Sequence, residues 1–243
     1  MLIAANWKMN LNKFSIEDFA GTLYEYEFTK QVKLCIFPSI IHVNYLKDMI
    51  ATLPVAVGGQ TCHYEKRGAF TGDISADALL EAGCEYVLLG HSERRKYHNE
   101  SNSFIKKCAT TALHNGLIPI ICVGENIRER EDDIATKVVE NQLNECMPDE
   151  FGEIVIAYEP LWSIGTGKIP TMKQIMEMHG VIKQAVGLQS KLVKVLYGGS
   201  VNISNASEIL SVDNVDGLLV GGASLHANEL LQIYNLAAEQ CQI

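Results

Sequence analysis

The feature of the sequence that most constrains the fold is an eightfold alternation of short apolar runs with longer segments of helical period. The runs are rich in β-branched residues and apolar at consecutive positions, as in strands buried on both faces. Amphipathic stretches such as SNSFIKKCATTALHNG separate them. The runs are LIAANWK (2–8), KLCIFP (33–38), VAVGGQ (55–60), YVLLG (86–90), LIPIICVG (117–124), EIVIAYE (153–159), KVLYGG (194–199) and DGLLVGG (216–222). Strands that alternate with helices predict a parallel sheet of the α/β class.

Length and composition favour a single domain. The chain has 243 residues, of which 47% are hydrophobic, and α/β barrels commonly reach this length as one domain. No Ser/Pro-rich linker or abrupt change in composition divides the sequence. Eight strand–helix units close into a barrel more naturally than they form an open sheet. We therefore expect residues 1–243 to form a single-domain (β/α)8 barrel.

Charge and cysteine content argue against several classes of protein. The formal net charge is −9, without a run of Lys and Arg, which argues against a nucleic-acid or anionic-membrane partner. Seven scattered cysteines without a C-x-x-C pair suggest reduced thiols, a cytoplasmic location and no metal site. No apolar stretch is long enough to predict a membrane span, and MLIAANWKMN lacks the pattern of a signal peptide. An anionic ligand must be attracted by local groups.

Polar side chains gather at the predicted carboxyl ends of three strands, which is the end where active sites lie in barrels of this kind. Asn6 and Lys8 end the first run, His91 follows the fourth, and Glu159 ends the sixth. Each residue alone is more simply explained as a solvated or structural group. Together they offer hydrogen bonds and positive charge to a carbonyl oxygen, and a carboxylate base for a neighbouring C–H proton.

Glycine pairs end the seventh and eighth runs. Such pairs commonly serve turns with positive φ, but glycines 198–199 and 221–222 also allow backbone N–H groups to approach a ligand closely. Loops at this place often form the phosphate site of a barrel. The glycines of IGTGKIP do not have the spacing of a nucleotide-binding motif. With no metal-ligand cluster and no cofactor lysine in the sequence, the pattern predicts proton transfer on a phosphorylated substrate without a cofactor.

Seven stretches make the chain resemble the triosephosphate isomerase family. They occur in the family's order over essentially the full length, and GHSERR, AYEPLWSIGTGK and YGGSV are highly specific in combination. The stretches are AANWKMN (4–10), GQTCHYEKRGAFTGDIS (59–75), GHSERR (90–95), PIICVGE (119–125), AYEPLWSIGTGK (157–168), YGGSV (197–201) and VGGASL (220–225). The resemblance implies a TIM barrel that interconverts dihydroxyacetone phosphate and D-glyceraldehyde 3-phosphate in glycolysis and gluconeogenesis, usually as a homodimer.

The same resemblance implies a role for each polar residue. Glu159 would remove a proton from one substrate carbon and return it to the next through an enediol(ate). His91 would polarise the carbonyl and move protons between the two oxygens, as a neutral imidazole whose pKa is lowered at a helix N-terminus, as the family is known to arrange it. Asn6 and Lys8 would stabilise the developing oxyanion.

Supporting residues are also implied by the resemblance. Ser92 and Glu93 would open the helix that follows His91, with Glu93 as the partner of Lys8. Phosphate would bind to backbone N–H groups of Gly165, Ser200, Gly221 and Gly222. A lid that closes over the phosphate and excludes water would consist of Pro160, Leu161, Trp162, Ser163, Ile164, Gly165, Thr166, Gly167 and Lys168.

Two segments have consequences beyond the chemistry. The long loop HYEKRGAFTGDIS (63–75) would insert its tip, Phe70 and Thr71, into a second subunit; the alternative is a flexible surface loop. The lid ends in Lys168-Ile169-Pro170, where the family usually has Lys-Thr-Ala. Pro170 either restricts the hinge, since proline fixes φ and constrains the preceding residue, or opens the following helix.

Two other classes of protein stay open at this point. One is a different phosphate-binding barrel enzyme, such as a sugar-phosphate aldolase or an indole-pathway barrel. An aldolase needs a Schiff-base lysine at a strand end, where only Lys8 is placed. The other is a catalytically silent barrel that serves in binding, which need not retain Asn6, Lys8, His91 and Glu159 together.

Overall fold

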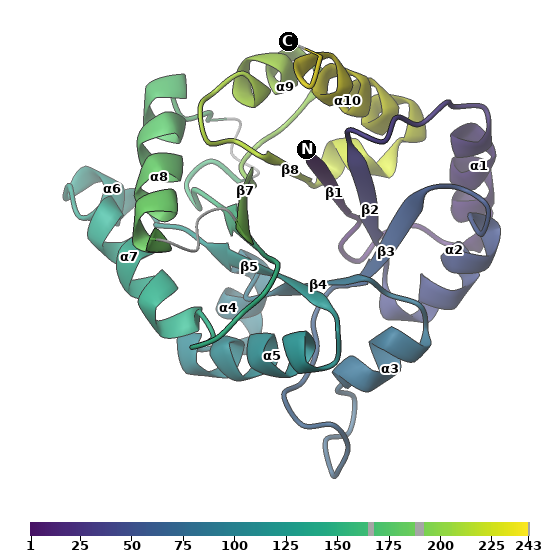
Figure 1. Ribbon diagram of the computed structural model, residues 1–243, viewed down its shortest axis with the longest axis horizontal. Helices are drawn as coiled ribbons and strands as arrows, with labels where there is room; N and C mark the ends of the chain where they lie inside the picture. The colour runs from purple at the N-terminus through teal and green to yellow at the C-terminus, as the bar shows by residue number, and fades with distance from the viewer. Residues whose placement is uncertain (165–167, 188–191, 243) are drawn as a thin grey trace.

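Eight parallel strands form a closed barrel in the computed structural model, which describes residues 1–164, 168–187 and 192–242. Each strand pairs with the next in sequence, and β8 pairs with β1 to close the sheet (Figure 1). The predicted (β/α)8 barrel is therefore confirmed. The strands are β1 (Leu2–Asn6), β2 (Lys33–Phe37), β3 (Val55–Gly59), β4 (Tyr86–Leu89), β5 (Ile118–Val123), β6 (Ile154–Tyr158), β7 (Val193–Tyr197) and β8 (Gly217–Val220).

Helices surround the barrel on its outer face (Figure 1). Within the described residues, no helix is long and apolar enough to cross a membrane. The helices are α1 (Lys13–Tyr24), α2 (Val43–Met49), α3 (Ala76–Glu81), α4 (Ser92–His98), α5 (Asn102–His114), α6 (Ile127–Glu131), α7 (Ala135–Cys146), α8 (Met172–Ala185), α9 (Ile203–Leu210) and α10 (Ala227–Gln240), with short 3-10 turns η1 (Ile40–His42) and η3 (Gly222–Leu225).

The core has two layers because successive strand side chains point to opposite faces of the sheet. Every second strand residue faces into the barrel, where Leu2 and Ala4 of β1 pack with Val155 and Ala157 of β6. The alternate residues, such as Ile3 and neighbours on the other strands, pack outward against the helices. The barrel interior is thus a filled apolar core that forms a floor beneath its carboxyl end.

Several strands end earlier than the apolar runs predict. The first run extends to Lys8, but β1 ends at Asn6. Lys8 has a φ of 53°, in the left-handed region that interrupts an extended strand. In the same way Glu159 lies one residue beyond β6. The polar residues therefore sit on the loops that leave the strands.

The N-terminus of α8 bears on the hypothesis that Pro170 opens this helix. Thr171 is the N-cap, and its side chain accepts a hydrogen bond from the Gln174 N–H while the Gln174 side chain accepts from the Thr171 N–H. This capping box fixes the start of the helix at Met172. Pro170 precedes the cap, so it does not occupy the first helical position, where proline usually opens a helix.

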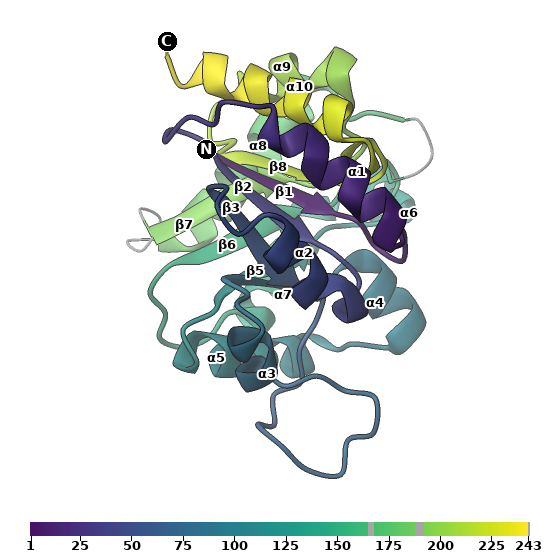
Figure 2. The same ribbon diagram turned by 90° about the vertical axis from the view of Figure 1, so that its right-hand side faces the viewer.

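The loop of residues 63–75 projects away from the barrel between β3 and α3 (Figures 1 and 2). Its two ends are joined by a hydrogen bond of 2.7 Å from the His63 N–H to the Ile74 carbonyl. Phe70, near the tip, lies over the His63 ring with 4.2 Å between centroids, yet is 40% exposed. The loop is thus closed at its base and presents an apolar tip to solvent.

Candidate active site

The alternation of side chains in the barrel explains why two polar groups point into its carboxyl end. On β1 the inward positions are Leu2 and Ala4, and the next in this series is Asn6. After Ala157 on β6, the next inward position is Glu159, which is only 2% exposed. These polar side chains lie on top of the apolar floor for the same reason that the floor residues point inward.

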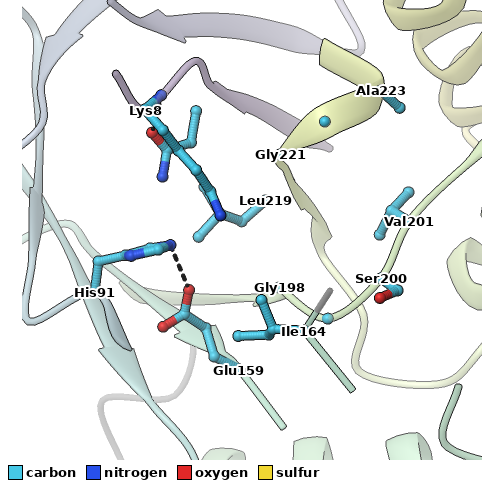
Figure 3. A pocket seen from close by; sticks show the side chains of 13 residues that line it. Lys8, His91, Glu159, Ile164, Gly198, Ser200, Val201, Leu219, Gly221 and Ala223 are labelled. Atoms are coloured by element: carbon cyan, nitrogen blue, oxygen red, sulfur yellow. Dashed lines mark hydrogen bonds and ion pairs between the residues drawn. The ribbon is translucent and has the colours of Figure 1, made fainter. Parts of the chain in front are cut away.

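The glycines of the seventh and eighth runs occupy the equivalent positions and leave space there. Gly198 lies two residues after the inward-facing Leu196, and Gly221 lies two residues after the inward-facing Leu219. The result is a cavity of about 250 Å3, with the titratable groups on one side and the glycine turns on the other (Figure 3). Its lining is Asn6, Lys8, His91, Glu159, Ile164, Gly198, Gly199, Ser200, Val201, Leu219, Gly221, Gly222 and Ala223.

The carboxylate of Glu159 is held by two donors. Its Oε1 lies 3.0 Å from His91 Nε2 (Figure 3), and its Oε2 accepts a hydrogen bond of 2.9 Å from the Ser92 N–H. The Glu159 backbone passes so close to Gly124 that a Cβ there would lie 1.8 Å from the Glu159 carbonyl oxygen. Both the side chain and the main chain of Glu159 are therefore fixed by their neighbours.

His91 is the N-cap of α4, and this fixes its tautomer. Its Nδ1 accepts a hydrogen bond of 3.3 Å from the Glu93 N–H, which leaves the proton on Nε2 and directed at Glu159. The Glu93 Oε2 is 3.5 Å from Nδ1, a contact that is favourable only if the ring is doubly protonated. The cap hydrogen bond is the shorter of the two, and it corresponds to a neutral imidazole.

The pKa of His91 differs in direction from the sequence expectation. Burial lowers this pKa, but the Glu159 carboxylate against Nε2 raises it, Glu93 raises it further, and the net result lies above the ordinary histidine value. A helix N-terminus disfavours a cation. In this arrangement the carboxylate contact outweighs it, so the predicted lowering is not found while Glu159 faces the ring.

Lys8 brings positive charge into the cavity from the turn after β1. Its Nζ lies 2.7 Å from Glu93 Oε1, and Figure 3 shows the side chain extended towards the centre of the pocket. The left-handed turn is held by Asn6, whose Oδ1 accepts from the Lys8 N–H, and by Gln60, which donates to the Lys8 carbonyl at 2.7 Å. The predicted pair of Lys8 and Glu93 is therefore present.

One buried carboxylate, which contacts the first residues of the lid segment from the loop after β5, is absent from the sequence predictions. Glu125 is fully buried, and its Oε1 accepts from Arg130 Nη2 at 2.7 Å, the Tyr158 hydroxyl at 3.1 Å and Trp162 Nε1 at 2.8 Å. Trp162 is thus tied to the loop after β5. The available signal was the position of Glu125 directly after the fifth apolar run.

The structure brings most of the predicted site residues together. Asn6, Lys8, His91 and Glu159 line the cavity, Ser92 and Glu93 contact its side chains, and the phosphate-turn residues Ser200, Gly221 and Gly222 face them. Of the lid, Ile164 lines the cavity, whereas Gly165, Thr166 and Gly167 lie outside the described residues. Phe70 and Thr71 are on the projecting loop and do not line this cavity.

No group of three or more His, Cys, Asp or Glu residues could hold a metal ion in the part of the chain that the structure describes. The site offers one carboxylate, one imidazole, one ammonium group and one amide, against backbone N–H groups on the opposite side. These groups can move a proton and stabilise an oxyanion.

Comparison with known proteins gives the family of the chain. The sequence model described as "Triosephosphate isomerase" matches residues 1–237. Triosephosphate isomerase of Hyphomonas neptunium is 42% identical over 247 residues and that of Afipia carboxidovorans 44% over 247 residues, each match covering at least 97% of both chains. The crystal structure of triosephosphate isomerase from Bartonella henselae superposes with a TM-score of 0.89 at 35% identity, covering 98% of each chain. The chain belongs to the triosephosphate isomerase family.

Proposed function

We propose that the chain interconverts dihydroxyacetone phosphate and D-glyceraldehyde 3-phosphate by proton transfer through an enediol(ate). The observation that carries the proposal is a single cavity in which the Glu159 carboxylate, the His91 Nε2–H and the Lys8 ammonium face the turns at Ser200 and Gly221. One end of a three-carbon phosphate would lie against the turns and the other among the titratable groups. Membership of the family supports the same reaction.

Glu159 is the proposed base. It would take the proton from the carbon next to the carbonyl and return it to the neighbouring carbon. The C–H electrons form the enediol(ate) double bond while the π electrons of the carbonyl move onto its oxygen. In this structure its oxygens face His91 Nε2 and the Ser92 N–H. The carboxylate must leave these donors to reach a substrate carbon.

His91 is the proposed electrophile for the substrate oxygens. The same Nε2–H that faces Glu159 would donate to the carbonyl oxygen once the carboxylate has moved to the substrate. Departure of that carboxylate removes the largest influence that raises the His91 pKa, and the N-terminus of α4 then favours the neutral ring. Asn6 and Lys8 would stabilise the negative charge on the oxygen, an interaction worth about 3 kcal/mol in a dry site.

The phosphate would be bound by backbone N–H groups of Ser200, Gly221 and Gly222, with Gly165 as a further proposed donor outside the described residues. The glycines have no side chain to obstruct an anion, and Lys8 adds positive charge to a chain with a net charge of −9. Local donors thus attract an anion that the protein as a whole repels.

The proposed lid, Pro160 to Lys168, would cover the phosphate and exclude water during the reaction. It begins directly after Glu159, so that any movement of its first residues is transmitted to the base. In this structure Trp162 donates to Glu125, a contact that joins the first residues of the segment to the loop after β5. Exclusion of water matters because an exposed enediol phosphate eliminates its phosphate.

A second copy of the chain is the proposed partner. Beside the site lies another cavity, of about 640 Å3. The loop of residues 63–75 of the second copy would insert its tip, Phe70 and Thr71, into this cavity. The lining includes Asn6, Lys8, Met9, Asn10, Ser39, Gln60, Leu88, His91, Glu93, Arg94, Tyr97 and His98. An inserted loop would support Asn6 and Lys8 from this side. We propose a homodimer, and sedimentation showing a fully active monomer at micromolar concentration would contradict it.

The proposed setting is glycolysis and gluconeogenesis in the cytoplasm. Six of the seven cysteines are buried as free thiols, which is typical of proteins in reducing compartments.

The deciding experiment is a coupled assay of glyceraldehyde 3-phosphate turnover by the purified chain, combined with proton NMR in D2O. Isomerisation through Glu159 predicts exchange of the transferred hydrogen with solvent deuterium, and loss of both turnover and exchange in Glu159→Gln. Condensation of glyceraldehyde 3-phosphate with dihydroxyacetone phosphate into a six-carbon bisphosphate would indicate an aldolase. Absence of turnover in the folded wild-type chain would indicate a silent barrel and end the proposal.

A further inference from the structure

Ser163 is a fully buried polar residue of the lid segment. Its accessible surface is 0%, whereas Leu161, Lys168 and Ile169 nearby are exposed. A buried hydroxyl is costly unless it is hydrogen-bonded. The contacts that Ser163 makes therefore indicate what the protein gains from this residue.

Ser163 joins two places within the lid segment. Its N–H donates to the Pro160 carbonyl at 2.8 Å, which closes the turn that follows Glu159. Its hydroxyl donates to the Lys168 carbonyl at 2.8 Å, five residues along the chain. One residue therefore links the first residues of the segment to its last.

Ser163 also connects the segment to the turn after β7. The Ser200 hydroxyl donates to the Ser163 carbonyl at 2.6 Å, and the Ser200 N–H donates to the Ser163 hydroxyl at 3.4 Å. A Cβ on Gly199 would lie 2.2 Å from the Tyr197 hydroxyl and 3.1 Å from Ser163 Oγ. The absence of a side chain at Gly199 thus allows Ser163 to pack against this turn.

The Ser200 N–H has two uses if the proposed function is correct. In this structure it points to Ser163 Oγ. The proposed function gives the same N–H to the substrate phosphate. A phosphate oxygen is the stronger acceptor because it is charged, so substrate would take the N–H over from the serine hydroxyl. The arrival of phosphate and the position of the lid segment are then linked through one side chain.

We infer that the Ser163 hydroxyl is a positioning group for the reaction: it holds the two ends of the lid segment together and seats them on the phosphate-binding turn. This inference rests on the proposed function. It makes Ser163, which touches neither the reacting carbons nor Glu159, a determinant of how well the enediol phosphate is shielded. Loss of the hydroxyl would loosen the segment and allow more intermediate to lose its phosphate to solvent.

The test compares wild type with Ser163→Ala, which removes the hydroxyl and adds no volume. The matched control is Ser211→Ala, because the Ser211 hydroxyl also donates to a main-chain carbonyl, that of Glu208 at 2.7 Å, beyond the end of α9. For each protein one measures kcat/KM for isomerisation and the fraction of turnovers that yield methylglyoxal and inorganic phosphate. In this side reaction the C–O bond to phosphate breaks and the enediol electrons form the new double bond.

A spectroscopic measurement separates positioning from stability. The chain has two tryptophans, so 5-fluorotryptophan labelling gives a 19F signal for Trp162 in the lid segment and a reference signal for the buried Trp7. The unreactive sn-glycerol 3-phosphate serves as the probe ligand. Ser163→Ala should broaden or shift the Trp162 signal and leave Trp7 unchanged.

The expected result for Ser163→Ala is a fall in kcat/KM of about tenfold, the worth of one hydrogen bond. The methylglyoxal fraction should rise about fivefold or more, with a melting temperature within about 3 °C of wild type. Ser211→Ala should match wild type in both readouts. Unchanged product ratio and Trp162 signal in an active Ser163→Ala would overturn the inference alone, whereas an inactive wild type would overturn the proposed function.

Discussion

Gly124→Ala should disable the site from a position that carries no catalytic group. The added Cβ would lie 1.8 Å from the Glu159 carbonyl oxygen, and ordinary contact begins at 3.4 Å, so the two backbones must separate by 1.6 Å. Gly124 cannot easily yield, because the Gln142 side chain donates to its carbonyl at 3.0 Å and accepts from its N–H at 2.8 Å. The displacement therefore falls mainly on Glu159.

The expected magnitude follows from this displacement. A misplacement of about 1 Å in a catalytic group costs on the order of a hundredfold in rate, so kcat should fall by about a hundredfold or more. Overpacking of this kind costs about 1–3 kcal/mol of stability, which leaves a folded protein. The change in KM should be small because the phosphate turns at Ser200 and Gly221 are not touched.

The assay is steady-state isomerisation together with thermal unfolding, and Gly180→Ala is the matched control. Gly180 lies within α8 with nothing within 4 Å of an added Cβ. Alanine there should leave kcat unchanged and stabilise the helix by about 0.5–1 kcal/mol. A folded Gly124→Ala enzyme with kcat within about threefold of wild type would refute the reasoning.

Three further predictions concern other parts of the molecule. Glu159→Asp should lower kcat on the order of a hundredfold with a modest change in KM, because the shorter side chain moves the base from its reactive position; unchanged turnover in steady-state kinetics would remove Glu159 from the mechanism. Burial lowers the pKa of His179 to about 4, while its Nδ1 lies 3.0 Å from the Asn214 carbonyl. The unfolded chain takes up this proton at about pH 6.5, so stability should fall as pH decreases from about 6.5 to about 4, by about 3 kcal/mol in total. Denaturant titrations at each pH would show this slope reduced in His179→Asn, and equal slopes would exclude His179 as the cause. Pro170→Ala should change the exchange rates of the Trp162 19F signal and shift kcat with them if the proline restricts the hinge; unaltered rates would show that it does not.

Much of the site could be predicted because it depends on periodicity. Alternation along β1 and β6 is enough to place Asn6 and Glu159 on the inner face of the barrel, and the parallel sheet places both at the same end. The eightfold repeat likewise specifies the barrel. These inferences need only which face a residue occupies, and that is a property of neighbouring positions in the sequence.

Contacts that depend on distance could not be predicted in this way. The left-handed turn at Lys8 follows from loop geometry, and it ends β1 before the apolar run ends. The direction of the His91 pKa depends on the 3.0 Å contact with Glu159, which joins residues 68 positions apart. Ser163 gives no sign of burial in the sequence, because its partners lie in the turn after β7 and across the lid segment.

His91 has a structural role in addition to the proposed chemical one, since its side chain caps the first turn of α4. Loss of an N-cap costs about 1 kcal/mol, so a substitution of His91 that removes the cap should lower stability as well as turnover. A descendant that abandoned the reaction would be expected to replace this histidine with Asn, Ser or Asp, which preserve the cap. Among related sequences, Asn, Ser or Asp at this position would then identify proteins that retain the helix but no longer catalyse the reaction.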